Sequence, residues 1–378
     1  MRGAGLEDVL PRVAEIVADV RSRGDEGLLD WTERLDGVRP ALRVPTEALE
    51  AARVDDDVLV SVRALAAAVA VFAEAQRPAD ASVEAVPGVR SERRWLPLSS
   101  VGIYVPGGRT AYPSSLVMAA VPARVAGVER IAVVTPRPAE ATLAVARELG
   151  IDEVYAVGGA QAVAALAYGT ETIPRVDKIV GPGNRWVTAA KLLVSSACAI
   201  DLPAGPSEVV AIADGHADAA RVAAGLLAQA EHGDDSEALL LTDDDELAME
   251  VERLVVNHHN VRVERVGSLA EAVERAEEYA PEHLELHVAD PESLVARIRN
   301  AGSVFVGCSS VVGDYAAGAT HVLPTGGLAR STGGLGVEAF LKPVQVVTAT
   351  AEGARRAAEV IVPLARAEGL PLHAAAAA

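Results

Sequence analysis

From Val101 onward, short apolar runs alternate with alanine-rich stretches of helical spacing, and this alternation constrains the fold more than any other feature. Strands that alternate with helices predict βαβ units and a mostly parallel sheet. A second series follows, with predicted helices over 217–231, 244–256 and 268–279. The predicted strands of the two series are GIYV, IAVVTP, EVYAVGG, KIVGPGN, EVVAIAD, EALLLTD, HLELHV and SVFVG. The fold class expected from this pattern is α/β, with two consecutive units.

The first hundred residues carry a helical pattern and little chemistry. LEDVLPRVAEIVADVRSRG ends at Gly24, a typical helix C-cap, and DEGLLDWTERLDG repeats apolar residues at helical spacing. We therefore expect helices before the first strand.

Composition excludes several classes of protein. The 378 residues include 53 acidic and 34 basic side chains, a net charge of −19, which disfavours nucleic acid as a partner. No secretory signal and no run of about 18 charge-free apolar residues is present, so we expect a cytoplasmic protein without a membrane segment. The two cysteines, Cys198 and Cys308, are too far apart in sequence for a metal knuckle or a redox pair.

Three glycine-rich turns stand between a predicted strand and a predicted helix, over 102–108, 157–166 and 180–191. Backbone N–H groups at such a helix start can hold a phosphate. The third turn has Gly181 and Gly183, but Trp186 stands where a dinucleotide fingerprint has its third glycine. Tyr104, in the first turn, is available to stack on or hydrogen-bond a cofactor. Each turn alone is equally compatible with an ordinary tight βα connection.

Polar residues in the second unit are more informative. Gln229 and His232 are three residues apart at a predicted helix end, so their side chains point the same way and suit one metal ion. Glu282 and His283 follow Pro281 directly before a strand, and an adjacent carboxylate and imidazole can act as bases at neutral pH.

Further acidic and imidazole side chains follow. Asp314 and His321 share a glycine-rich loop, and Glu368 and His373 lie near the end of the chain. Oxygen and imidazole ligands without thiolate favour zinc or another divalent first-row ion. A lone histidine at a helix end is, however, more often a solvated or capping side chain. Spacing alone thus predicts an α/β enzyme and leaves its metal dependence open.

Taken in order, the motifs resemble those of the histidinol dehydrogenase family from about Val17 to His373. The matching strings are DVRSRGDEGLLDWTERLDG, VGIYVPGGRTAYPSSLVMAAVPARVAGV, VGGAQAVAALAYGT, DKIVGPGNRWVTAAK, DLPAGPSEV, AQAEHGDDS, APEHLEL, GDYAAGATHVLPTGG and the terminal histidine. No single string decides the matter, but the ordered set is specific.

The resemblance implies two-step, NAD-dependent oxidation of the amino alcohol L-histidinol to L-histidine through the aldehyde. Glu282 would activate the attacking water, and His283 would remove the alcohol proton. One zinc ion per subunit would be held by Gln229, His232, Asp314 and His373. Substrate contacts would come from Ser207, Gln229, His232, His283, Asp314, Glu368 and His373, and NAD contacts from Tyr104, Gln161 and Asn184.

The resemblance also implies two incomplete Rossmann-like α/β domains with small helical terminal extensions. The expected division is 1–103 plus 209–335 for most metal and catalytic residues, 104–208 for NAD, and 336–378 as a C-terminal arm. That arm would complete the partner's site in a homodimer, so that Glu368 and His373 would act in trans.

The chain departs from the family pattern around the GDY motif. It has CSSVV at 308–312 where a proline and a glutamate are usual, Thr320 in place of an asparagine, and Glu237 in place of a glutamine. These departures bear on the substrate more than on the reaction type. Two alternatives are therefore kept: a paralogue that oxidises another small amino alcohol with the same zinc and NAD chemistry, and a zinc hydrolase that uses Glu282 and water without NAD.

Overall fold

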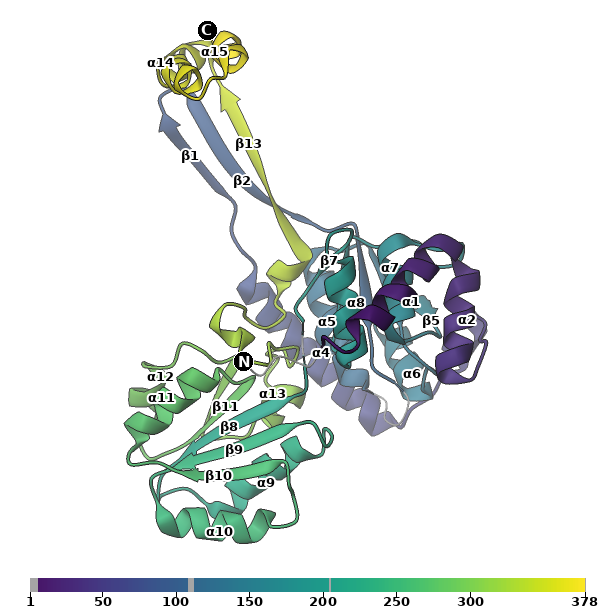
Figure 1. Cartoon of the computed structure of the whole chain (residues 1–378), viewed down its shortest axis with the longest axis vertical. Coiled ribbons are helices and arrows are strands. Elements are labelled where there is room, and N and C mark those ends of the chain that lie inside the picture. Colours follow the sequence, from purple (N-terminus) through teal and green to yellow (C-terminus); the bar gives the residue numbers. More distant parts are fainter. Residues whose placement is uncertain (1–5, 108–111, 204, 378) are drawn as a thin grey trace.

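The computed structural model describes residues 6–107, 112–203 and 205–377, which form two five-stranded parallel sheets and a three-stranded antiparallel ribbon. Figure 1 shows the two sheets, each with its helices, lying beside one another, while the ribbon projects away from both and ends in two helices. The predicted fold class is confirmed: two doubly wound α/β units with helical ends.

The first sheet has the strand order β5-β4-β3-β6-β7, in which the first strand in sequence is central. This order places the switch in winding direction between β3 and β6, where doubly wound sheets usually bind a ligand at the carboxyl ends of the strands. Its elements are β3 (Ser100–Tyr104), α5 (Pro113–Ala126), β4 (Arg130–Val134), α6 (Glu140–Glu148), β5 (Glu153–Tyr155), α7 (Gly159–Tyr168), β6 (Lys178–Val180), α8 (Arg185–Val194) and β7 (Ala199–Ile200).

The N-terminal helices pack on this first sheet. Helices α1 (Leu10–Arg23) and α2 (Asp25–Asp36) share a buried core with α7 and α8 on one face, whereas α4 (Asp56–Gln76) shares one with α5 on the other. The short α3 (Thr46–Ala51) contacts α6. Grouping 1–103 with 209–335 therefore differs from the observed packing, because the apolar faces of these helices are buried against the first sheet and β3 is its central strand.

Helix α4 is long and apolar enough to span a membrane by length and composition alone. One face of it, which includes Val62, Leu65 and Val69, is buried in the core beside the first sheet, and the other face exposes Val60 and Val71. Packing against α5 accounts for the apolar residues of the buried face.

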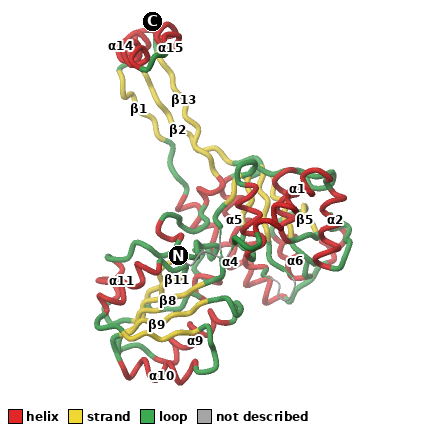
Figure 2. Tube along the Cα trace, in the orientation of Figure 1, coloured by secondary structure: helices red, strands yellow, loops and turns green. Residues whose placement is uncertain are grey.

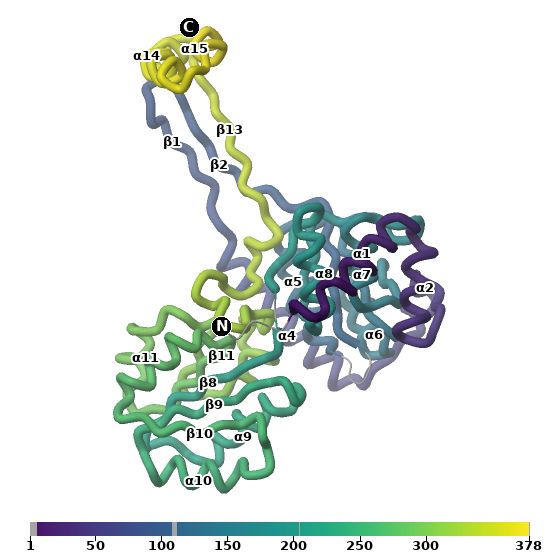
Figure 3. The backbone as a smooth tube through the Cα atoms, viewed as in Figure 1, coloured from purple at the N-terminus to yellow at the C-terminus, as the bar shows by residue number. Residues whose placement is uncertain are grey.

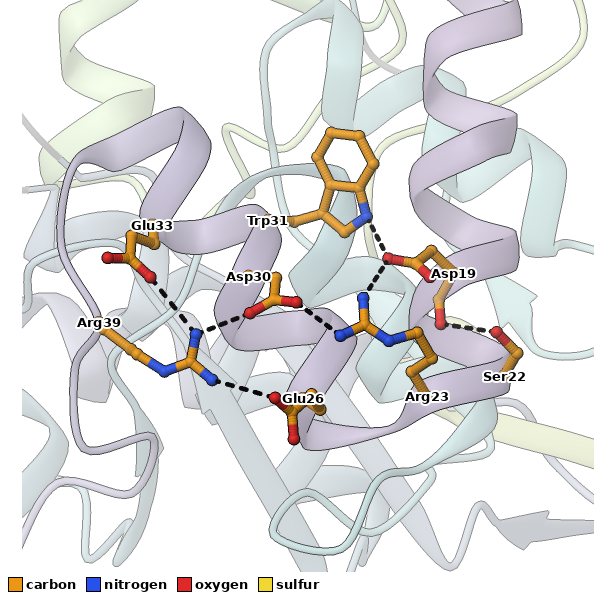
Figure 4. A network of polar contacts seen from close by, with 8 residues as sticks. All are labelled: Asp19, Ser22, Arg23, Glu26, Asp30, Trp31, Glu33 and Arg39. Carbon is orange, nitrogen blue, oxygen red and sulfur yellow. Dashed lines mark hydrogen bonds and ion pairs between the residues drawn. The ribbon is translucent and has the colours of Figure 1, made fainter.

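Polar contacts on the molecular surface join α1 to α2 (Figure 4). Arg23 donates to Asp19 (3.1 Å) and to Asp30 (2.5 Å), and Arg39 donates to Asp30 (2.7 Å). The indole of Trp31 donates to Asp19 (2.9 Å). Hydrogen bonds from Arg39 and Arg23 lower the pKa of Asp30 to about 2, so the Asp30 carboxylate is ionised at neutral pH.

The second sheet repeats the topology, with the order β10-β9-β8-β11-β12. Helices α9 and α10 cover one face and α11 and α12 the other, each over an apolar core. Its elements are β8 (Glu208–Ala213), α9 (Ala219–Ala230), β9 (Glu237–Thr242), α10 (Asp245–Val255), β10 (Val261–Arg265), α11 (Leu269–Tyr279), β11 (His283–His287), α12 (Pro291–Val295), β12 (Ser303–Val306) and α13 (Val311–Tyr315).

The ribbon joins segments that are far apart in sequence. Strand β2 (Val89–Pro97) pairs with β1 (Ala81–Val86) on one side and with β13 (Leu341–Ala349) on the other, and Figures 2 and 3 show β13 returning alongside β2. Short 3-10 turns at Leu328–Arg330 and Val337–Phe340 precede β13, and helices α14 (Ala351–Ala367) and α15 (Pro371–Ala377) end the chain. We call β1, β2, β13, α14 and α15 the arm.

The prediction that the first hundred residues are helical is thus wrong for residues 81–97, which contain β1 and β2. All of β1 is exposed and β2 is largely so, which removes the apolar alternation by which a strand is usually recognised. The second partner of β2, β13, follows about 250 residues later, which local pattern cannot anticipate.

Candidate active site

Most of the predicted catalytic residues lie at the amino edge of the second sheet. Ser207 directly precedes β8, and His283 is the first residue of β11. A crossover helix runs antiparallel to the strands that it connects, so α9 ends at the same edge and brings Gln229 there. Sequence positions 207, 229 and 283 are therefore brought together by the βαβ topology.

Glu282 is buried, with 6% of its surface exposed. Its Oε2 accepts hydrogen bonds from the Ser207 hydroxyl (2.7 Å) and from the Glu208 backbone N–H (3.0 Å). Burial raises the pKa of Glu282 to about 7, although these two hydrogen bonds oppose the shift. A carboxyl with such a pKa can accept and release a proton near neutral pH.

His283 lies between two carboxylates. Its Nδ1 is 3.6 Å from Glu282 Oε2 and its Nε2 is 4.0 Å from Asp314 Oδ1. Burial lowers the pKa of His283, so the neutral imidazole is favoured and can accept a proton. Neither ring nitrogen has a hydrogen-bond partner within the described residues, although the ring is buried. Both nitrogens thus have hydrogen-bonding capacity for a substrate or a water.

Asp314 lies in the short helix α13 rather than in an open loop. Glu285, two residues after His283 and on the same face of β11, accepts a hydrogen bond from the backbone N–H of Ser310 (2.6 Å) at the start of this helix. The side chain of Glu285 also contacts His287 Nε2 (3.0 Å). A buried carboxylate on β11 thereby fixes the helix that presents Asp314 beside His283.

His321 connects the two units. Its Nδ1 is 3.8 Å from Asp314 Oδ1, and its Nε2 is 3.3 Å from the hydroxyl of Ser115, which lies on α5 of the first unit. Burial lowers the pKa of His321 to about 4, which keeps the ring neutral. The side chains of Asp314 and His321, predicted to share a loop, do lie together.

Gln229 is buried beside Ser207, whose hydroxyl is 3.4 Å from Gln229 Oε1. The Gln229 Nε2 has no hydrogen-bond partner among residues 6–107, 112–203 and 205–377. Nδ1 of His232 is 3.3 Å from the Gln229 backbone carbonyl. Amide oxygen, imidazole nitrogen and the Asp314 carboxylate form a donor set that suits zinc.

The predicted zinc ligands do not come together within one chain of the described structure. Within the described residues, no group of three or more His, Cys, Asp or Glu side chains is arranged to hold a metal ion. One of the predicted ligands is an amide, and another, His373, is exposed on α15 at the far end of the arm (Figure 1). The substrate residue Glu368, at the end of α14, is exposed there as well. Within one chain the fold therefore does not bring Glu368 and His373 to the other site residues.

Two adjoining cavities lie at this edge. One, of about 330 Å³, is bordered by Ser207, His232, Glu282, His283 and Asp314 and also by Tyr112, Ser115 and His321. The other, of about 720 Å³, is bordered by Leu6, Arg185, Thr188, Leu192, Asp235 and Leu328 among others. Both are bordered by Gly183, Asn184, Gly205, Pro206 and Ser207, so the turn after β6 and the entry to β8 separate them.

The three predicted NAD residues lie at the carboxyl edge of the first sheet. Tyr104 ends β3, and its hydroxyl accepts a hydrogen bond from the Gly159 N–H (3.1 Å). Burial raises the pKa of Tyr104 to about 12. Gln161, in the first turn of α7, is 1% exposed, and its Oε1 has no partner within the described residues. Asn184 caps α8. Gly108 of the first glycine-rich turn lies outside the described residues.

Sequence patterns missed three residues that shape the site. Glu285 and Glu208 are ordinary members of predicted strands, and only the fold reveals that they bind the backbones of Ser310 and Gly326. Ser115 is 206 residues from its partner His321. No local signal marks such contacts. Cys198 is buried in a core cluster, and burial raises its thiol pKa to about 11.

The fold and the site define a two-unit α/β protein, in which the carboxyl edge of one doubly wound sheet faces a cluster of buried acidic and imidazole side chains on the other. An acetylating aldehyde dehydrogenase from Geobacillus thermoglucosidasius shares this fold, with a TM-score of 0.53 at 12% identity over 92% of this chain and 95% of that one.

The particular family is clear from closer relatives. The sequence profile of histidinol dehydrogenase matches residues 2–378. The histidinol dehydrogenase of Haloarcula marismortui is 47% identical, over 99% of this chain and 94% of that protein. The crystal structure of histidinol dehydrogenase from Elizabethkingia anophelis has a TM-score of 0.92 at 36% identity, over 98% of this chain and 92% of that one. The chain belongs to the histidinol dehydrogenase family.

Proposed function

We propose that this protein oxidises L-histidinol to L-histidine through the aldehyde, the last step of histidine biosynthesis, with NAD as the hydride acceptor. Family membership over the whole chain supports the reaction. The observation that carries it is the convergence of two buried bases, Glu282 and His283, on a cavity that is also bordered by Asn184 of the cofactor turn.

The first oxidation needs a base for the alcohol proton. His283 fills this role, because its imidazole is neutral and both of its ring nitrogens are available to the substrate. His283 would take the proton of the alcohol, and NAD, when bound, would supply the acceptor for the hydride that leaves with formation of the aldehyde. Asp314 and Glu282 flank the ring and stabilise the imidazolium that results.

The second oxidation needs water. Glu282 removes a proton from the water that adds to the aldehyde, and its pKa of about 7 suits that transfer. The hydrated aldehyde is again an alcohol, and its oxidation to the acid would use a second NAD as the hydride acceptor. Because water is the nucleophile, the pathway needs neither Cys198 nor Cys308.

Gln229, His232 and Asp314 would hold one zinc ion per subunit, together with His373 of a second copy. When bound, zinc would fix the substrate through its imidazole and amine nitrogens and so orient the reacting carbon. Ser207 and Glu368 would add substrate contacts, as would His283 and the ligand residues. Gln229 would bind the metal through its amide oxygen, which lies 3.4 Å from the Ser207 hydroxyl.

The second copy belongs to a homodimer with shared sites. The arm exposes apolar side chains, among them Val360, Leu364 and Leu372, of which Leu372 is 81% exposed. Such a surface is typical of an interface. Docking of α14 and α15 on a partner would cover it and would deliver Glu368 and His373 to the partner's cavity.

NAD would bind at the switch point of the first sheet, where Tyr104, Gln161 and Asn184 lie. The turn at Gly183 and Asn184 borders the catalytic cavity, which would place the reactive ring next to the bases. A soluble biosynthetic enzyme is consistent with this arrangement.

The test is NADH formation by the purified, zinc-loaded protein with L-histidinol and a panel of other amino alcohols, with NAD binding measured on the same sample. We expect two NADH per histidinol. Turnover of another amino alcohol but not of histidinol would identify the protein as a paralogue with a different substrate. Absence of NAD binding would favour a zinc hydrolase instead.

A further inference from the structure

A buried ion pair lies behind the cofactor turn. Lys191, on α8, contacts Asp201, which directly follows β7, and their side chains are 2% and 1% exposed. Removing two charges from water costs several kcal/mol per ion, and attraction compensates only where hydrogen bonds satisfy the rest of each group. None of the roles proposed above uses either residue.

The remaining hydrogen bonds of the pair converge on one residue of the turn. Lys191 Nζ donates to the carbonyl oxygens of Gly181 and Leu202, both at 3.0 Å, in addition to its ion pair with Asp201. Asp201 Oδ2 accepts from the Gly181 N–H (2.7 Å). Both backbone polar groups of Gly181 are thus bound by the pair.

Gly181 has little freedom to move elsewhere. Its φ is +109°, a conformation that side chains rarely adopt, and a Cβ there would overlap the Tyr104 carbonyl oxygen. The ion pair therefore holds the turn in contact with the end of β3, where the switch point of the first sheet lies.

The two backbone segments held by the pair lead to the two halves of the site. Gly181 leads to Asn184, which borders both cavities. Leu202 leads to Ser207, which donates to Glu282. The ion pair therefore connects the cofactor turn to the segment that enters the second sheet.

We propose that Lys191 and Asp201 are positioning residues that set the cofactor turn relative to the Ser207 segment; this inference rests on the proposed NAD-dependent function. Neither residue borders either of the two cavities. Their effect is to fix the distance between the bound cofactor and the bases at Glu282 and His283.

Lys191→Met, Asp201→Asn and the double variant test this proposal in the full-length, zinc-loaded protein. A small displacement of a group that binds the cofactor weakens binding strongly. We therefore expect the Kd for NAD to rise at least about tenfold in each single variant, and kcat to fall as well. Zinc content is expected to remain that of the unsubstituted protein, because no proposed ligand contacts the pair.

The double variant separates positioning from stability. Removing both charges abolishes the uncompensated buried charge that each single substitution leaves, so the melting temperature should recover in part. We expect the Kd for NAD to stay raised. If NAD affinity recovers together with stability, the pair is merely structural and the proposal is wrong. Should the single variants not fold, the double variant carries the test.

Arg130→Met is the matched control. Arg130 pairs with Glu153 (2.8 Å) and donates to the carbonyls of Arg175 and Pro174, so it resembles Lys191 in its contacts, but it lies at the amino edge of the same sheet. The Arg130→Met variant should be less stable than the unsubstituted protein, and its affinity for NAD should not change. An equal loss of NAD affinity in this control would overturn the positioning role. Failure of the unsubstituted protein to bind NAD would instead contradict the proposed function itself.

Discussion

The two sheets have the same strand order and winding, yet the residues proposed to function lie at opposite edges of the two sheets. The first sheet uses its carboxyl edge, where Tyr104 and Asn184 lie near the switch between β3 and β6. The second uses its amino edge, where Ser207 and His283 lie at the starts of β8 and β11. Ser115 on α5 of the first unit contacts His321 beside the second sheet's site.

The difference arises from the residues at the strand ends. At the carboxyl edge of the second sheet, Asp214 accepts hydrogen bonds from the backbone N–H groups of His216 (2.9 Å) and Ala289 (2.8 Å). The Asp214 carboxylate thereby links the segments that follow β8 and β11. A ligand crevice would otherwise form between these segments. The shared topology thus determines where the strands and helices end. The residues at those ends determine which edge of the sheet binds a ligand.

His283→Asn is expected to have the largest effect. The substitution removes the proposed base for the alcohol proton, and general base catalysis typically contributes about 10² to 10⁴ in rate. Alcohol oxidation should fall by this factor, while the Kd for NAD, which depends on the first sheet, should not change. Initial rates of NADH formation and equilibrium NAD binding check both. If NAD binding were lost as well, the assignment of NAD binding to the first sheet and of the base to the second would be wrong.

Glu282→Gln separates the two oxidations. The amide cannot take a proton from water, so oxidation of the aldehyde should fall by about 10² or more, with a much smaller effect on the alcohol step. Single-turnover assays started with histidinol or with its aldehyde distinguish the steps. Equal losses in the two assays would contradict the separate roles of Glu282 and His283.

The pH dependence of the aldehyde step should reflect Glu282. Burial raises its pKa to about 7, so the carboxyl becomes protonated and inactive as a base when the pH falls below that value. A bound cation lowers the pKa, so in the zinc-loaded enzyme the acid limb should lie below pH 7. A profile of kcat against pH measures it. The limb should be missing from the residual activity of Glu282→Gln, and its persistence there would assign it to another group.

Asn184→Ala should have a modest effect confined to the first sheet. Its Oδ1 accepts from the backbone N–H groups of Trp186 (3.0 Å) and Val187 (3.2 Å), and loss of such a cap costs about 1 kcal/mol of stability. The KM for NAD should rise several-fold with little change in kcat. Ser268→Ala, which removes the cap of the remote helix α11, is the control: it should lower stability and leave the KM for NAD unchanged.

The sequence predicts the two sheets well because each strand and helix carries its own periodic pattern and each glycine-rich turn its own signal. It also predicts that Glu282, His283, Asp314 and Ser207 act together, but through the family resemblance rather than through spacing. The structure supports that grouping independently, since all four border one cavity.

What sequence could not supply depends on contacts between distant segments. The ribbon needs β2 to pair with β13, and the exposed faces of the ribbon carry no apolar alternation. The contact of Ser115 with His321 and the pairing of Lys191 with Asp201 arise only once the sheets are formed. The grouping of the N-terminal helices with the first sheet likewise follows from packing.

Mixing two inactive variants tests most directly whether the site combines the bases at the second sheet with a partner's arm. His283→Asn has a defective cavity and an intact arm, and His373→Ala has the reverse. After the subunits are exchanged, random pairing gives half heterodimers, each with one intact site of two, so about one quarter of the unsubstituted activity should return. If heterodimers form and no activity returns, the site is not shared between subunits.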